Sequence, residues 1–203
     1  MRRWCVALAA LLLASCSPPN SEANFHRWLE ADATRAASFA RFEALLARED
    51  VSSVVPTYEL WLTDQLRDQC VAGPFMPPPE EAWAHIIPAL RFIRDHVKPA
   101  IGDVRVVSSY RDEAFNACVQ GAPQSAHRHF YALDLVPVDR AVSRRQLIQT
   151  LCPIHARDGA RASIGLGIYA GQRFHIDARG FRGWGVDYHR ATFPCDGRNN
   201  PRQ

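Results

Sequence analysis

The chain has 203 residues, of which 47% are hydrophobic and 22% are charged. This balance is ordinary for a globular protein, and the length is sufficient for one domain with a buried core. The formal net charge is only +3 and the arginines are scattered, which excludes the basic stripe of a nucleic-acid-binding protein and a strongly charged membrane-binding face. We expect a monomer with no nucleic-acid partner.

The N-terminus has the layout of a secretory signal. Arg2 and Arg3 precede a short apolar run, and small residues stand before Cys16. The letters LASC also resemble a bacterial lipobox, so we expect a signal peptide over residues 1–15 and a tether over residues 16–24, lipidated at Cys16. A plain signal or a short apolar helix is the alternative. The expected location is the bacterial cell envelope, with the exported protein lipid-anchored in the periplasm, at the outer membrane.

The cysteines beyond the expected signal indicate disulfides. They are Cys70, Cys118, Cys152 and Cys195, and an even number in an exported protein favours pairing, with three possible connectivities. The pairing that we expect joins Cys70 to Cys118 and Cys152 to Cys195. Because the sequence has no CxxC pair, a zinc site built from these cysteines is disfavoured.

Helical patterns dominate the first half of the chain. Apolar residues recur at helical spacing from residue 25 to about residue 48, and we expect an N-terminal helical region over residues 25–79. The proline-rich stretch GPFMPPP interrupts this pattern. The stretch PEEAWAHIIPALRFIRDHVKPAIG then predicts a long helix, opened by a proline and two acidic residues and closed by Gly102.

Strand patterns dominate the second half. DVRVVSSY, YALDLVPVD, GLGIYAG and RFHIDARGFRGW each predict one strand, the last two joined around Gly171. RDEAFNACVQG predicts a short helix, and SRRQLIQTLCPIHA predicts a helix that begins after Ser143. Helices that come mostly first, followed by irregularly spaced strands, favour an α+β fold with a small, mostly antiparallel sheet and packed helices.

Three residues of the strand region suit a metal ion. His127 precedes the strand that contains Asp134, and His175 lies on a later strand. Two imidazoles and a carboxylate suit zinc, and three protein ligands leave a fourth position for water, as in catalytic zinc sites. Taken singly, each residue has an ordinary alternative, such as a surface histidine or an aspartate paired with an arginine. We expect one Zn²⁺ per chain.

Two charged residues complete this expected site. Asp177 follows His175 by two positions, so on a strand both side chains would point to the same face, and Asp177 could accept the proton of a zinc-bound water. Arg111 follows the strand DVRVVSSY directly and could stabilise an oxyanion or bind a substrate carboxylate.

The stretches SSYRDEAFNACVQGAPQSAHRHFYALDL and GLGIYAGQRFHIDARGFRGW resemble the zinc-dependent D-Ala-D-Ala carboxypeptidases of the peptidase M15 family, which have the hedgehog/DD-peptidase fold. That family shares Ser-x-Tyr-Arg, then Ser-x-His-x-x-Gly-x-Ala-x-Asp, then an apolar-His-x-Asp strand that ends near a tryptophan. The resemblance covers roughly residues 80 to 185 and implies a zinc peptidase domain over residues 80–203.

The resemblance implies a role for each matching residue. The zinc ligands would be His127, Asp134 and His175, with Asp177 as general base and Arg111 as the oxyanion or carboxylate partner. Substrate contacts are expected from Ser125, Tyr110 and His129. For His129, a solvent-exposed or supporting position is the alternative.

The sequence departs from the family pattern at two positions. Phe130 stands where the family has glycine, and we expect it to reshape the pocket; spoiled site geometry is the alternative. Some relatives carry the base three residues before the ligand histidine, where this chain has Gln172, so Asp177 is the preferred base.

The function that these features predict is hydrolysis of an amide bond in peptidoglycan stem peptides or cross-links, of the D,D-carboxypeptidase or endopeptidase type. One alternative is a catalytically inactive, zinc-containing lipoprotein that binds the cell wall. A purely structural envelope lipoprotein is another, but it leaves the pattern of histidines and aspartates to coincidence. The scissile bond stays open, because pocket walls rather than metal ligands determine specificity.

Overall fold

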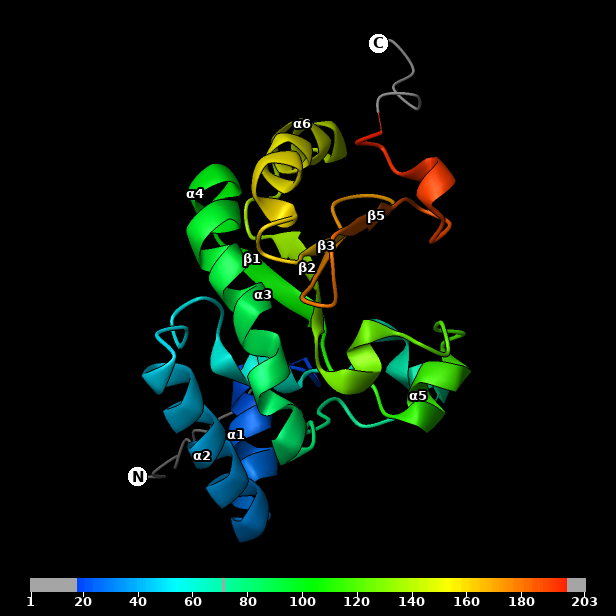
Figure 1. Ribbon diagram of the computed structural model, residues 1–203. Coiled ribbons are helices and arrows are strands. Elements are labelled where there is room, and N and C mark those ends of the chain that lie inside the picture. Colours follow the sequence, from blue (N-terminus) through cyan, green and yellow to red (C-terminus); the bar gives the residue numbers. More distant parts are fainter. Residues whose placement is uncertain (1–17, 71, 197–203) are drawn as a thin grey trace, which may run out of the picture.

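The structure is a computed structural model that describes residues 18–70 and 72–196 (Figure 1). The expected signal peptide and the expected lipidation site at Cys16 lie outside these residues. Within the two described ranges, no helix is both long and apolar enough to cross a membrane.

The N-terminal region is helical, as predicted. Helix α1 (Glu22–Glu30) begins at Ser21 and helix α2 (Ala33–Arg48) begins at Asp32, and each of these two side chains accepts a hydrogen bond from a backbone N–H of the first turn. Two short 3₁₀ helices follow, η1 (Thr57–Trp61) and η2 (Gln65–Cys70). Apolar residues of this region belong to the same buried cluster as those of the sheet, so residues 25–79 share one core with the rest of the chain.

The stretch predicted as one long helix is a continuous helical run with changing hydrogen-bond patterns. It consists of the 3₁₀ helix η3 (Glu80–Ile86), α3 (Ile87–Phe92), the π-helical η4 (Ile93–Val97) and α4 (Lys98–Ile101). Two of the three changes fall next to Pro88 and Pro99, whose missing N–H groups cannot continue the α-helical pattern. The run ends at Gly102, which has a φ of 78°.

A five-stranded sheet in the order β1-β2-β4-β3-β5 follows the helical run. Its strands are β1 (Val104–Ser108), β2 (Ala132–Pro137), β3 (Gly165–Ile168), β4 (Phe174–Asp177) and β5 (Arg182–Trp184). All neighbouring pairs are antiparallel except β3 and β5, which are parallel. The sheet is therefore mixed but mostly antiparallel.

The prediction of one strand over RFHIDARGFRGW was wrong, because this segment forms both β4 and β5. The Asp177 side chain accepts a hydrogen bond from the backbone N–H of Arg179, and Gly180 has a φ of 141°. These features turn the chain out of β4, and β5 then pairs with the far edge of β3.

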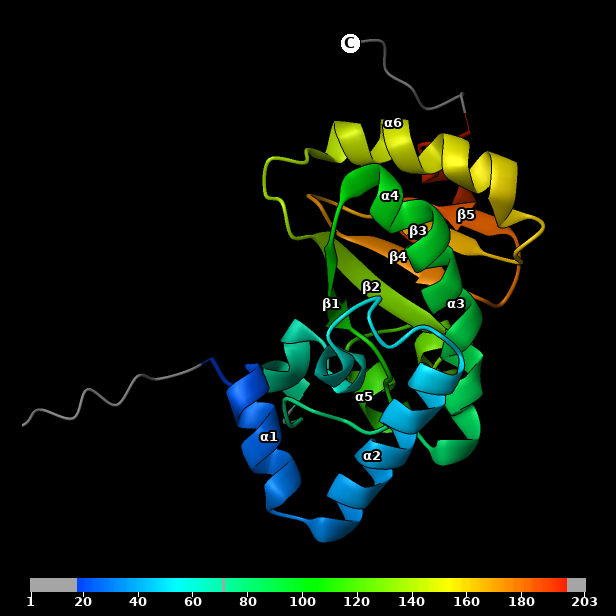
Figure 2. The ribbon, with the colours of Figure 1, turned by 90° about the vertical axis from the view of Figure 1, so that its left-hand side faces the viewer.

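Helices cover one side of the sheet. Figures 1 and 2 show α6 (Arg144–Ile154) and the run from η3 to α4 on the same side, with α5 (Glu113–Cys118) on the opposite side. Strands β2 and β4 bury Leu133, Leu135 and Ile176 in the core. Asp134 and His175, which alternate with these apolar residues, therefore lie on the other face of the sheet.

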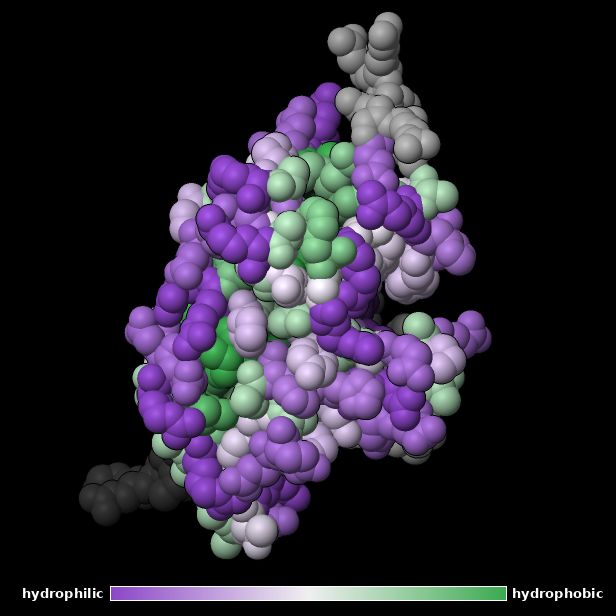
Figure 3. Space-filling model, in the orientation of Figure 1, coloured by the Kyte–Doolittle hydropathy of each residue, from purple (hydrophilic) through white to green (hydrophobic). Residues whose placement is uncertain are grey.

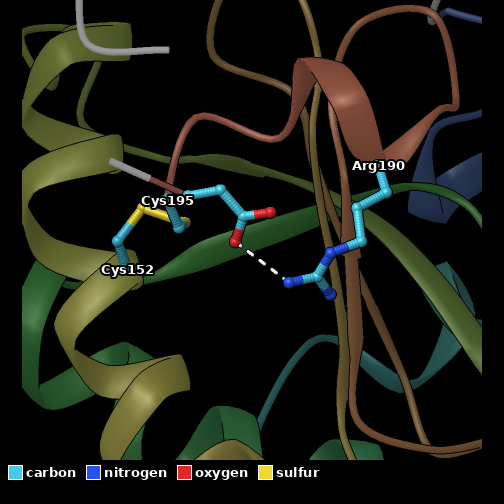
Figure 4. The surroundings of a disulfide bond; sticks show 4 residues. Cys152, Arg190 and Cys195 are labelled. Carbon is cyan, nitrogen blue, oxygen red and sulfur yellow. Dashed lines mark hydrogen bonds and ion pairs between the residues drawn. A yellow bond between two sulfur atoms is a disulfide. The ribbon is translucent and has the colours of Figure 1, made fainter. Parts of the chain in front are cut away.

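Two disulfides join segments that are distant in sequence, and their pairing is the expected one. Cys70 at the end of η2 is bonded to Cys118 at the end of α5, and Cys152 in α6 is bonded to Cys195. Figure 4 shows the second disulfide, next to which Arg190 donates a hydrogen bond to Asp196. The first disulfide thus joins two short helices, and the second ties the segment around Cys195 to α6.

Candidate metal centre

The three predicted ligands come together. One ligand atom from each of His127, Asp134 and His175 lies within 4.8 Å of the other two, and all three residues are buried. Asp134 and His175 are paired directly across β2 and β4. His127 lies in the short 3₁₀ helix η5 (Ala126–His129). Ser125 caps the start of this helix, and β2 follows shortly after its end.

Hydrogen bonds fix the orientation of both imidazoles. The Nδ1 atom of His127 lies 2.6 Å from the carbonyl oxygen of Ser109; since a carbonyl only accepts, this nitrogen carries the proton. The Nε2 atom of His127 is then left facing His175 Nδ1 at 3.2 Å and Asp134 Oδ2 at 3.4 Å. The other ring nitrogen of His175, Nε2, lies 3.1 Å from Asp177 Oδ2.

This arrangement fits a metal ion. Histidine ligands in proteins almost always donate their outer N–H to a carbonyl or carboxylate, which orients the ring. Here Ser109 and Asp177 are in these outer positions, while the inner nitrogens converge with the Asp134 carboxylate. The group of His127, Asp134 and His175 could therefore hold a metal ion.

A pair of arginines and a second aspartate support Asp134. The Nη2 atoms of Arg111 and Arg173 lie 3.0 and 2.5 Å from Asp134 Oδ2. The same two atoms lie 3.0 and 2.6 Å from Oδ2 of Asp64, and Arg111 also donates to the hydroxyl of Ser108. Asp64 comes from the N-terminal region, which therefore completes the site.

Sequence reasoning missed Asp64 and Arg173. Arg173 precedes His175 by two positions, and the alternation of side chains along an extended segment would have placed both on one face. Asp64 lies in an aperiodic segment between η1 and η2, where no sequence pattern indicated a role.

The buried charges shift the pKa values of the ligands in opposite directions. Burial and the nearby charge of Arg111 lower the pKa of His127 to about 4. Burial opposes charge on His175 as well, but hydrogen bonds and attraction from Asp134 and Asp177 outweigh it and raise its pKa. Burial would raise the pKa of Asp134, but the hydrogen bond and charge of His175 outweigh it and hold that pKa well below the usual value, so Asp134 stays ionised. A metal ion would therefore compete with a proton mainly at His175.

Asp177 occupies a different position from the one expected of a general base. It lies at the Nε2 side of His175, whereas Nδ1 is the atom that faces Asp134. Its carboxylate is fully buried and also accepts hydrogen bonds from Arg182 and from the backbone of Arg179, at 2.8 Å each. Burial would raise the pKa of Asp177, but His175 and Arg182 outweigh it and lower that pKa. These contacts orient His175 and leave Asp177 facing away from the ligand cluster.

The ligand cluster lies at the base of a cavity of about 620 Å³. One wall comes from residues 119–126, directly after Cys118, and the other from residues 182–190, which include β5. Figure 3 shows the molecule hollowed on its right-hand side, between the part that contains β5 and the part that contains α5 in Figure 1. Arg111 and Ser125 line this cavity, as the expected roles require.

Two expected substrate contacts do not lie on the cavity. Tyr110 and His129 are absent from its lining among the described residues, and His129 is exposed. The backbone oxygen of His129 instead contacts the ring of His85. Aromatic residues that sequence reasoning did not assign to substrate do line the cavity: Tyr169, Trp184 and Tyr188. His189, expected to be structural, lines it as well.

Phe130 does not reshape the cavity. Its side chain is fully buried in the hydrophobic core, and its ring centroid lies 6.0 Å from that of Phe42 in α2. Its φ is 55°, a left-handed conformation that favours glycine. The chain needs this conformation to turn from η5 into β2, where the backbone N–H of Phe130 donates to the carbonyl of His127.

Comparisons with known proteins give no match. No family model matches the chain, and neither the curated proteins nor the solved structures provide a similar sequence or fold. The geometry of the cavity and the sequence motifs are therefore what support a function.

Proposed function

We propose that this protein is a zinc-dependent peptidase that hydrolyses an amide bond in peptidoglycan stem peptides or cross-links. One observation carries the proposal: the inner atoms of His127, Asp134 and His175 converge at the base of an open cavity, and the outer atoms are held by hydrogen bonds. The resemblance to the peptidase M15 family supports the substrate class. The lipobox-like N-terminus and the disulfides support an exported, lipid-anchored protein of the cell envelope.

Zinc suits two imidazoles and one carboxylate, and when bound it would supply a water of lowered pKa and polarise the scissile carbonyl. The chain supplies the surroundings. Arg111 is held in place by Ser108 and Asp64, and its guanidinium would bind the carbonyl oxygen or a carboxylate of the substrate. The Tyr169 hydroxyl accepts a hydrogen bond from Trp184 and keeps its own proton for donation, because burial and the charge of Asp134 raise its pKa.

The cavity is large enough for several residues of an extended peptide, since typical ligand pockets measure about 300–1,000 Å³. Ser125, in the wall formed by residues 119–126, would contact the substrate close to the scissile bond. Asp177 acts in this proposal by orienting His175 rather than by accepting a proton from water.

A second candidate function is a zinc-containing protein that binds the cell wall without turnover. The position of Asp177 favours it, because the carboxylate expected to act as base is buried and faces away from the ligand cluster. Phe130 gives this candidate no support, since its ring lies in the core.

Incubation with a muropeptide mixture, followed by mass spectrometry, tests the proposal. The purified protein is used zinc-loaded and chelator-stripped, next to a His127→Ala variant and a His129→Ala control that removes a nearby exposed histidine. Cleavage that requires zinc and His127 but not His129 would support the peptidase, and the released mass would identify the bond. One bound zinc with muropeptide binding but no cleavage would favour the second candidate. A protein that binds no zinc would refute both.

A further inference from the structure

Two aromatic residues have left-handed backbone conformations, with φ values of 55° for Phe130 and 66° for Tyr188. A bulky side chain is strained in this region, and such strain persists only where the surroundings enforce it. Burial of the Phe130 ring in the core offsets its strain. The Tyr188 side chain is 74% exposed, so little burial within the protein offsets the strain at this residue.

Close packing enforces the conformation of Tyr188. Its backbone N–H donates to the carbonyl of Gly185, whose own N–H donates to the carbonyl of His189. The Asp187 side chain accepts hydrogen bonds from the backbone of His189 and from the hydroxyl of Thr192. A side chain at position 185 would lie 2.1 Å from the carbonyl oxygen of Thr192, so the turn packs directly against the 3₁₀ helix η7 (Arg190–Thr192).

The ring of Tyr188 extends a continuous aromatic surface that starts at the ligand cluster. The Trp184 ring centroid lies 4.9 Å from that of His175, and the Trp184 indole donates to the Tyr169 hydroxyl. The Tyr169 and Tyr188 rings follow at 5.4 Å. Gly167 makes room for this arrangement, because a side chain there would lie 2.5 Å from the Trp184 indole nitrogen. We call Trp184, Tyr169 and Tyr188 the aromatic wall.

We infer that Tyr188 contacts substrate, and that the aromatic wall binds a C–H-rich part of the substrate beyond the residues flanking the scissile bond. Residues with strained backbones cluster at active sites and ligand-binding sites, and Tyr188 lines the cavity. An aromatic face packs well against a saturated sugar ring or a long aliphatic side chain, and either presents the same C–H-rich surface. The inference rests on the proposed function, and it makes Tyr188 a determinant of which muropeptides bind.

The test compares Tyr188→Gly and Tyr188→Phe with a Ser163→Gly control in the full-length, zinc-loaded protein. Ser163 is also exposed, has a φ of 55°, and does not line the cavity. Removing strain should raise Tm by about 2 °C for both glycine variants. Only Tyr188→Gly should weaken muropeptide binding, by about tenfold in calorimetry, with a larger effect on KM than on kcat. Tyr188→Phe should bind like the wild type, because it keeps the aromatic face.

Muropeptides with and without sugar distinguish the two possible sources of the C–H-rich surface. If Tyr188→Gly weakens binding of sugar-bearing muropeptides but not of sugar-free stem peptides, the wall binds the sugar; if both weaken, it binds a side chain of the peptide. Unchanged affinity of Tyr188→Gly for every ligand that the wild type binds would overturn the inference and leave the proposed function standing. A zinc-loaded wild type that binds no muropeptide would overturn both.

Discussion

Replacing Phe130 by alanine and by glycine separates two opposing contributions of this residue to stability. The ring is fully buried, and truncation of a buried phenylalanine to alanine costs about 3–5 kcal/mol. Alanine keeps the strain of the left-handed backbone, whereas glycine removes it and recovers about 1 kcal/mol. We therefore expect Phe130→Ala to lower the free energy of unfolding by about 4 kcal/mol and Phe130→Gly by about 3 kcal/mol.

The relative stability of Phe130→Ala and Phe130→Gly tests the backbone strain directly. Phe39 provides the matched control, because it is also buried but lies inside α2, where glycine is about 1 kcal/mol less favourable than alanine. Urea unfolding with linear extrapolation would measure the free energy of unfolding of the alanine and glycine variants at both positions. Glycine should be the more stable replacement at position 130 and the less stable one at position 39. If Phe130→Ala is more stable than Phe130→Gly, the left-handed backbone at position 130 is not a source of strain.

Three further predictions concern the metal centre and the cavity walls. Asp177→Asn should lower zinc affinity by about 10–100-fold, as expected for a residue that orients a ligand; lost turnover with unchanged affinity in a chelator competition would instead make Asp177 the base. Zinc affinity should fall as pH drops through the raised pKa of His175, because a metal ion must displace its proton. Calorimetry in buffers of different ionisation enthalpy should detect this released proton, and pH-independent affinity would contradict the assigned ligands. Replacing Cys152 and Cys195 by serine should lower the free energy of unfolding by about 4 kcal/mol in urea unfolding, from the chain entropy of a loop of this length. Retained stability in that double variant would show that packing alone holds the second cavity wall.

The sequence by itself predicted the α+β class, most of the elements and the three residues that come together in a group that could hold a metal ion. These features depend on local properties: helical spacing in α2, alternation in β2 and β4, and a capping serine before α6. The meeting of these three residues was predictable because His127 and Asp134 flank the start of one strand, the side chain of His175 suits the same metal ion, and the motifs that carry all three resemble those of one family. The disulfide pairing was also the expected one, although spacing alone allowed two other connectivities.

Only the tertiary structure decided how the rest of the site is assembled. Asp64 and Arg173 are 109 positions apart in sequence, yet they form an ion pair beside Asp134. No local sequence pattern predicts this contact. Strand alternation placed Asp177 on the face of His175, but the orientation of the imidazole, set by Asp134 on a neighbouring strand, decided which side of the ring Asp177 occupies. The left-handed conformation of Phe130 likewise depends on α2, which is distant in sequence, because packing of the Phe130 ring against Phe42 offsets the backbone strain.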